Sequence, residues 1–140
     1  RLAMYRALEG KLSHIDSETT NVLAISNSEW FARDTLGLLK SKVTKADYPT
    51  HNLIDLNKIS DNEYDICVSD QVLEHIEGDP FKAFSESARV VRSGGYVCHT
   101  TCLINEIHGS PSDFWRFTPD ALRLLARERA EHEMFRPLFL

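Results

Sequence analysis

Tyr64-Asp65-Ile66-Cys67-Val68-Ser69 is the stretch of sequence that decides the fold. It is short, mostly apolar and contains β-branched residues, so it predicts a buried β-strand. Outward from it, Asn21-Val22-Leu23-Ala24-Ile25 and residues 96–101 are further apolar runs that predict strands. Two weaker strands are expected over residues 42–47 and 52–55, and the polar character of the first places it near a sheet edge.

Two helices are predicted in the N-terminal third of the chain. The apolar residues of segment 2–13 recur at spacings of three and four, which is the period of one helix face. Ser28 is suited to cap a helix that begins at Glu29, whose carboxylate favours the positive end of a helix. The buried face of this second helix would consist of Ala32, Leu36 and Leu39.

Two further helices are predicted in the C-terminal half. Asp79 caps the first of them and Pro80 takes its first turn, and Ser93-Gly94-Gly95 ends it. Its buried face would consist of Phe81, Phe84, Ala88 and Val91. A polar loop over residues 103–117 precedes the second helix, which begins at Thr118-Pro119 and turns Leu122, Leu125 and Ala126 inward.

Strands that alternate with helices predict an α/β fold, in which helices cover both faces of a parallel sheet. We expect a single domain over residues 1–140, with an N-terminal helical segment at 1–19 and the α/β core at 20–140. In such sheets the ligand binds beyond the carboxyl ends of the strands. The residues that directly follow each strand are therefore the candidates for a functional site.

Composition narrows the class of protein. The chain has 140 residues and a net charge of −5, which argues against a dedicated nucleic-acid binder. It contains no apolar run of the roughly 18 residues that a membrane span needs, and no signal peptide is predicted. The chain has three cysteines, Cys67, Cys98 and Cys102. Their odd number and irregular spacing suggest neither a disulfide framework nor a metal site. We therefore expect the protein in the reducing cytoplasm.

Polar residues at the strand ends suit a cofactor that contains a nucleoside. Asp47 could accept hydrogen bonds from a ribose diol, and Asp55 from an exocyclic amine. The turn at residues 26–28 would present backbone amides to a carboxylate or phosphate. An aspartate at a strand end, taken alone, is more often a solvated turn residue. Their occurrence in this order is what favours the cofactor.

Three segments resemble class I S-adenosylmethionine-dependent methyltransferases of the type 11 group. Residues 64–76 end in Val72-Leu73-Glu74-His75, as in that family, and residues 88–96 resemble the segment that follows. Residues 108–119, with Asp113-Phe114-Trp115-Arg116-Phe117-Thr118-Pro119, resemble a subgroup often found beside sugar- and polysaccharide-modifying genes. The resemblance implies a Rossmann-like fold, S-adenosylmethionine as cofactor, and a small molecule or sugar precursor as substrate.

The resemblance also implies roles for individual residues in cofactor binding. Asp47 would hold the ribose hydroxyls, and Asp55 with the amide of Leu56 would hold the adenine. The methionine end would face the backbone of Ser69 and the turn formed by Ser26, Asn27 and Ser28.

The acceptor side is assigned to the polar loop. His108 is the first choice for a general base, with a hydrogen-bonded loop histidine as the alternative. Trp115 and Arg116 would form a stacking and anion-binding wall for the substrate, or would hold the loop on the body, with Asp113 paired to Arg116. Glu74 and His75 are interpreted as a structural signature, with a catalytic dyad as the less favoured alternative.

The sequence departs from the family at its first loop. The family is glycine-rich there, whereas residues 22–30 contain no glycine, and Ser, Asn and Trp adopt positive φ less readily. The expected consequence is impaired cofactor affinity. Trp30 either obstructs the pocket or, as we favour, points into the core.

The lost glycines and the short C-terminus also support a second hypothesis, a non-catalytic methyltransferase-like module. The full fold has two more strands, and only residues 134–140 are left to supply one. A sheet edge left open in this way favours docking or a homodimer. A nicotinamide-dependent oxidoreductase is disfavoured, because the Gly-x-Gly-x-x-Gly motif is absent.

Overall fold

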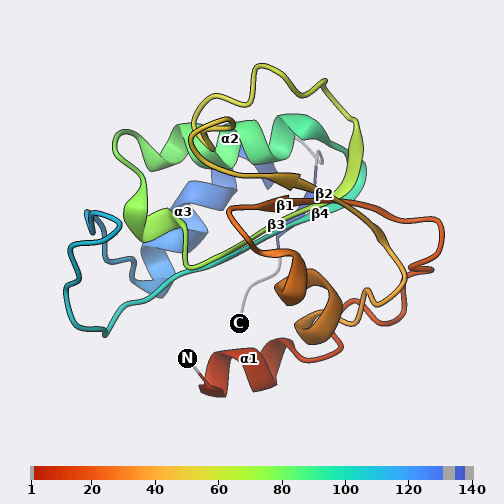
Figure 1. The fold of residues 1–140 in the computed structure, drawn as a ribbon, viewed down its shortest axis with the longest axis horizontal. Coiled ribbons are helices and arrows are strands. Elements are labelled where there is room, and N and C mark those ends of the chain that lie inside the picture. Colours follow the sequence, from red (N-terminus) through yellow and green to blue (C-terminus); the bar gives the residue numbers. More distant parts are fainter. Residues whose placement is uncertain (1, 131–134, 138–140) are drawn as a thin grey trace.

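The computed structural model describes residues 2–130 and 135–137. Its strands and helices alternate along the chain, except that the strand Tyr64–Asp70 follows the strand Lys42–Ala46 directly (Figure 1). The strands are β1 (Asn21–Ile25), β2 (Lys42–Ala46), β3 (Tyr64–Asp70), β4 (Val91–Thr100) and β5 (Phe135–Pro137). The helical elements are α1 (Leu2–Leu8), η1 (Phe31–Thr35), η2 (Leu73–His75), α2 (Pro80–Val90) and α3 (Pro119–Ala130).

The strands form one sheet in the order β2-β1-β3-β4-β5, and every pairing is parallel. β3 lies at its centre and is buried from Tyr64 to Ser69, which explains its apolar sequence. β2 is an edge strand, as its polar composition predicts. The register pairs Ile25 with both Ala46 and Ser69, so the carboxyl ends of three strands meet at one end of the sheet.

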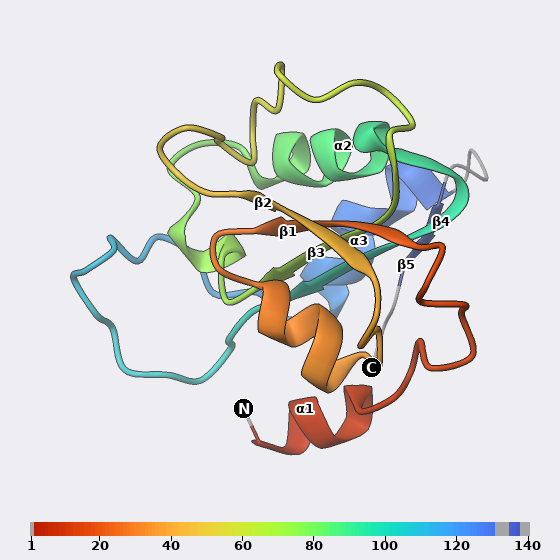
Figure 2. The same ribbon diagram turned by 45° about the vertical axis from the view of Figure 1, so that its right-hand side comes forward.

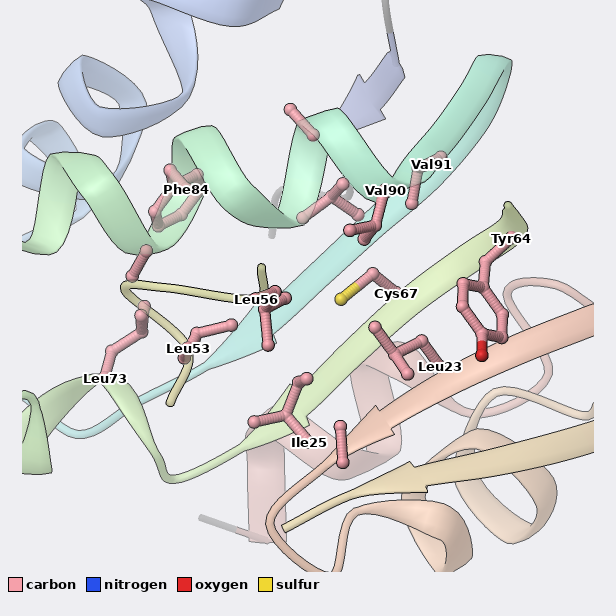
Figure 3. Close-up of a cluster of buried hydrophobic side chains, with 14 of the residues drawn as sticks. Leu23, Ile25, Leu53, Leu56, Tyr64, Cys67, Leu73, Phe84, Val90 and Val91 are labelled. Atoms are coloured by element: carbon pink, nitrogen blue, oxygen red, sulfur yellow. The ribbon is translucent and has the colours of Figure 1, made fainter. Parts of the chain in front are cut away.

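Helices cover both faces of the sheet, which confirms the predicted α/β, Rossmann-like fold (Figure 1). On one face, Leu23, Ile25 and Cys67 pack with residues of α2 such as Phe84 and Val90 (Figure 3). On the other face, the alternate residues of β1 and β3 pack against α1 and η1. The two clusters together follow from the period of two in side-chain direction along each buried strand.

The predicted helix over residues 2–13 is shorter in the structure. α1 ends at Leu8, because Gly10 adopts a left-handed conformation (φ +66°) that turns the chain. The predicted buried faces also need correction. Leu39 is 69% exposed and Phe81 is 38% exposed, whereas Ala32, Leu36, Phe84 and Ala88 are buried as predicted. Asp79 caps α2 as expected, by accepting from the amide of Phe81.

The prediction of a strand over residues 52–55 is wrong. The segment forms a turn closed by an isolated antiparallel bridge between Asn52 and Asp55. The backbone that follows is bonded to α2 instead of to a sheet neighbour. The amide of Leu56 donates to Glu86 Oε2 at 2.8 Å, and the guanidinium of Arg89 donates to the carbonyls of Leu56 and Ile59 at 2.9 Å. Glu86 also raises the pKa of Arg89 above its usual range, so this link stays charged.

The C-terminal strand lies within the segment that the sequence leaves for it. β5 pairs with Gly95, Tyr96 and Val97 of β4 (Figure 2), while residue 134 and residues 138–140 lie outside the described residues. Beyond Val97, no strand of the described chain pairs with the outer side of β4. None of the described helices has the length and apolarity that crossing a bilayer requires.

The start of β4 requires a glycine. Between Tyr64 and Ile66 of β3, the partner strand runs from Val91 to Tyr96, so β4 bulges where it leaves α2. A Cβ atom on Gly95 would lie 2.3 Å from the carbonyl oxygen of Asp65, which belongs to the backbone of the central strand. This close approach explains why residue 95 is a glycine, whereas from the sequence alone the glycine is attributed to the end of the helix that begins at Pro80.

We expect Gly95→Ala to destabilise the fold by about 3 kcal/mol or more, because the added methyl group forces the backbones of β3 and β4 apart. Gly109→Ala is the matched control, since a Cβ atom there meets nothing within 4 Å. Urea unfolding of both variants measures the difference, and equal midpoints would contradict the interpretation.

Candidate functional site

A cavity of about 610 Å³ lies at the carboxyl ends of β1, β2 and β3. Its walls come from the segments that follow these strands and from the loop between β4 and α3. The lining residues are Ser26 and Asn27 after β1; Tyr48, His51, Asn52 and Leu53 after β2; Gln71, Val72, His75, Ile76 and Glu77 after β3; and Pro111, Ser112 and Phe114 of the loop. The position agrees with the general rule for ligands of open parallel sheets.

The loop after β1 adopts the left-handed conformation without glycine. Ser26 and Asn27 have φ values of 49° and 61°. The amide of Asn27 donates to Asp47 Oδ1 at 3.0 Å, and the amide of Ser26 donates to the carbonyl of Ala46 at 3.2 Å. These bonds hold the turn against the end of β2. Asp47 is therefore fixed beside the cavity by the turn that the sequence predicts as its partner in cofactor binding.

Ser28 does not cap a helix with its side chain. Its hydroxyl donates to the carbonyl of Ile25 and accepts from the amide of Asp70 at 2.9 Å. The buried Ser28 therefore ties the carboxyl end of β1 to that of β3. It does not line the cavity, and neither does the fully buried Ser69.

Two predicted adenine contacts lie away from the cavity. Asp55 is exposed and accepts from the side chain of Asn57. The amide of Leu56 is already bonded to Glu86. Both positions follow from the turn that replaces the predicted strand, because that turn directs Asn52 and Leu53 to the cavity instead.

Trp30 matches neither of its two predicted placements. It is 42% exposed and does not line the cavity. Its ring packs edge-on against Tyr5 of α1, with centroids 5.5 Å apart, and against Phe31. The hydroxyl of Tyr5 in turn donates to the carboxylate of Asp70 at 3.0 Å, which ties α1 to the end of β3.

The loop between β4 and α3 projects beside the segment that follows β3 (Figure 2). Glu74, which is fully buried, holds both ends of it. Its carboxylate accepts from the hydroxyl of Thr101 at 2.9 Å and from the thiol of Cys102 at 3.6 Å. Its carbonyl accepts from the amides of Phe114 and Trp115 at 2.8 and 3.1 Å. We call this set of contacts, together with those of His75 and Ile76 described next, the loop clasp.

The next two residues complete the loop clasp. His75 Nδ1 lies 2.8 Å from the carbonyl oxygen of Ser112, and the indole of Trp115 donates to the carbonyl of Ile76 at 2.8 Å. Arg116 pairs with Asp113 and holds the pKa of that carboxyl well below its usual range. Trp115 thus bonds the loop to the body, whereas Arg116, among the described residues, bonds only to Asp113 and Trp115 of the loop itself.

His108 lies behind the cavity wall. Its ring is tilted against that of His75, with centroids 4.9 Å apart, and its amide donates to Asp113 at 3.3 Å. Its Nδ1 atom is buried and has no hydrogen-bond partner within the described chain. The structure therefore brings His108 close to the site, but His75 is the histidine of this pair that lines the cavity.

Sequence reasoning missed several lining residues, among them Tyr48, His51 and Gln71. Each follows a strand by one to five residues, so its position was the available signal.

The cysteines do not form a site. Burial raises the pKa of Cys67 and of Cys98 to about 12, so both are neutral thiols. Among the residues that the structure describes, no three His, Cys, Asp or Glu side chains are grouped as metal ligands.

A hydrogen-bond chain that joins β3, β4 and α2 fixes the state of His99. The hydroxyl of Ser87 donates to the carbonyl of Ala83, so it accepts from His99 Nε2 at 3.0 Å. His99 Nδ1 then accepts from the hydroxyl of Ser69 at 2.6 Å. Desolvation lowers the pKa of His99 to about 4, so the ring is neutral in the folded chain.

Comparison with known proteins gives both a family match and structural matches. The sequence model of the family described as "methyltransferase domain" matches residues 12–99. No curated protein matches the chain at a significant level.

Three solved structures are similar in fold, and each aligns over 91% of this chain. A chain of the complex between the Haloferax volcanii Trm112 methyltransferase activator and a putative methyltransferase has 16% identity and a TM-score of 0.61, over 71% of its length. The [4+2]-cyclase SpnF has 16% identity and a TM-score of 0.60, over 56% of its length. A putative sarcosine dimethylglycine methyltransferase from Galdieria sulphuraria has 18% identity and a TM-score of 0.54, over 55% of its length.

The loop after β1 generates a first prediction. We expect Ser26→Gly and Asn27→Gly each to stabilise the fold by about 0.5–1 kcal/mol, because glycine relieves the strain of a side chain at positive φ. Asn105→Gly, at an exposed position without positive φ, should be neutral or destabilising. Urea unfolding distinguishes these results, and destabilisation by both loop variants would contradict the interpretation.

The state of His99 generates a second prediction. Below pH 6.5, the ordinary pKa of histidine, the His99 ring binds a proton in the unfolded chain. In the folded chain the ring binds that proton only near pH 4, because its pKa is lowered to about 4. The contribution of His99 to the free energy of unfolding is therefore complete above pH 6.5 and decreases between pH 6.5 and 4. By pH 5 this partly buried ring has lost about 1–2 kcal/mol of that contribution. His99→Gln should flatten the dependence of the unfolding free energy on pH in this range. The exposed His14→Gln control should leave it unchanged.

Proposed function

Because the chain belongs to the methyltransferase-domain family, whose model matches residues 12–99, we propose that it transfers a methyl group from S-adenosylmethionine to a small molecule or a sugar precursor. S-adenosylmethionine is the cofactor of this family. The observation that carries the proposal is the cavity of about 610 Å³ that Ser26 and Asn27 line, with Asp47 bonded to the amide of Asn27. This chain spans little more than half of two of the similar structures, so activity and substrate of the whole protein are part of the proposal.

The residues present fit the ribose side of the cofactor. A volume of this size is typical of small-molecule sites. Asp47 uses Oδ1 for the amide of Asn27, and its Oδ2 has no bond within the described chain and is left for a ribose hydroxyl. Ser26 and Asn27, which line the cavity, are the residues we propose for the methionine end.

The adenine side needs different residues from those expected. Asp55 is exposed, and Glu86 occupies the amide of Leu56. We assign the adenine wall to Asn52 and Leu53, which line the cavity between Asp47 and the segment after β3.

When bound, the cofactor supplies a methyl group on a sulfonium, which is transferred by in-line displacement. The chain has to orient the acceptor and to receive any proton that it releases. The acceptor side of the cavity is formed by Pro111, Ser112 and Phe114, which belong to the segment that resembles the sugar-associated subgroup. This location supports a sugar or polysaccharide precursor as the acceptor, with His108 and Trp115 in the wall behind it.

A second function is supported by the open side of β4. A non-catalytic module could dock a partner or a second copy there, because no described strand covers β4 beyond Val97. One similar structure is a complex with a methyltransferase activator, and another is a [4+2]-cyclase, so the fold alone does not decide for methyl transfer.

Calorimetric titration with S-adenosylhomocysteine tests the proposal. We expect micromolar binding, and we expect Asp47→Ala to weaken it by about 10- to 100-fold, because a hydrogen bond to a charged group contributes about 1.5–3 kcal/mol. Asp55→Ala is the matched control and should bind as the wild type does. Absence of binding to a folded chain would reject the enzyme and favour the docking module.

A further inference from the structure

The bond between His75 and Ser112 fixes which nitrogen of the His75 ring carries hydrogen. His75 Nδ1 lies 2.8 Å from the carbonyl oxygen of Ser112. A carbonyl oxygen only accepts hydrogen bonds, so Nδ1 must donate. A neutral imidazole has a single N–H group, and the second nitrogen, Nε2, is then left with its lone pair.

His75 Nε2 is available to a ligand. His75 lines the cavity, and no group within the described chain is hydrogen-bonded to its Nε2 atom. The loop clasp holds the ring from behind, because Glu74 and Ile76, on either side of His75, bind Trp115 through their carbonyls. The position of this lone pair is therefore set by the backbone of two segments.

His108 differs in all these respects. It does not line the cavity, and its buried Nδ1 atom has no partner that would select one tautomer. Its ring packs against that of His75 and supports it from the side.

We propose that His75 Nε2 accepts a hydrogen bond from a hydroxyl or amine of the molecule that binds in the cavity, and that it is the proton acceptor in methyl transfer. The second part rests on the proposed function. A bond forms between the methyl carbon and the acceptor oxygen or nitrogen, and the carbon–sulfur bond breaks with its electron pair left on sulfur. The proton of the acceptor moves to Nε2 and leaves His75 as an imidazolium.

The walls beside His75 define the class of acceptor further. Val72, Ile76 and Phe114 provide apolar and aromatic surface next to this single lone pair. The arrangement suits a ring that carries a hydroxyl group. Phenol is the smallest probe of this kind, and anisole has the same ring with the hydroxyl hydrogen replaced by methyl.

The first measurement is the tautomer of His75, by long-range ¹⁵N–¹H correlation NMR at pH 8 on the chain without cofactor. We expect hydrogen on Nδ1 and an unprotonated Nε2. Because free histidine favours the opposite tautomer, a ring with hydrogen on Nε2 would overturn the proposal. This result does not depend on cofactor binding, so it is separate from the failure of the proposed function.

The second measurement is titration with phenol and with anisole, followed at the ¹⁵N resonances of His75. We expect phenol to bind about five- to tenfold more tightly than anisole and to shift Nε2, because only phenol donates to it. Equal affinities, or a shift at His108 alone, would overturn the proposal.

Two matched variants locate the effect. His75→Asn places an amide N–H near the position of Nδ1 and so keeps the bond to Ser112, but it lacks the second nitrogen. We expect it to retain the unfolding midpoint and to lose the preference for phenol, whereas His108→Asn should keep that preference. If phenol is preferred at Nε2 but S-adenosylhomocysteine does not bind, the hydrogen-bonding role stands and the proton transfer is rejected.

Discussion

The parallel pairing of β3 with β1 and with β4 is the constraint on which the other features depend. A strand buried on both faces needs neighbours on both sides and helices above and below it. Since all strands run in one direction, the segments that follow them gather at one end of the sheet. Ser28 strengthens this arrangement, because its hydroxyl bonds the end of β1 to the amide of Asp70, the last residue of β3. The cavity is the space that these segments leave between them.

The loop after β1 shows how backbone conformation is kept when glycine is absent. Ser26 and Asn27 take positive φ, and the carboxylate of Asp47 accepts from the amide that this conformation exposes. The local strain is offset by a hydrogen bond to a charged group. The carboxylate therefore has a structural role in the loop in addition to the role proposed in binding.

Short apolar runs, helical spacing and capping residues were enough to predict β1, the central strand, α2 and α3, because these signals are local to each element. The turn at residues 52–55 was not predictable, since it depends on Glu86 and Arg89, which lie on another element. Of the cofactor residues predicted at the strand ends, Ser26 and Asn27 line the cavity, and their roles in binding stay predictions. The tautomer inferred for His75 depends on the carbonyl of Ser112, 37 residues away, which no local pattern contains.

The loop clasp joins two stretches that look like independent motifs in the sequence. The carbonyls of Glu74 and Ile76 accept from Phe114 and Trp115, and the ring of His75 donates in return to the carbonyl of Ser112. Neither stretch has its full set of partners without the other. The two stretches therefore have to be exchanged together in a chimera. A loop taken from another protein needs that protein's equivalent of residues 74–76, because without it the loop lacks its hydrogen-bond partners.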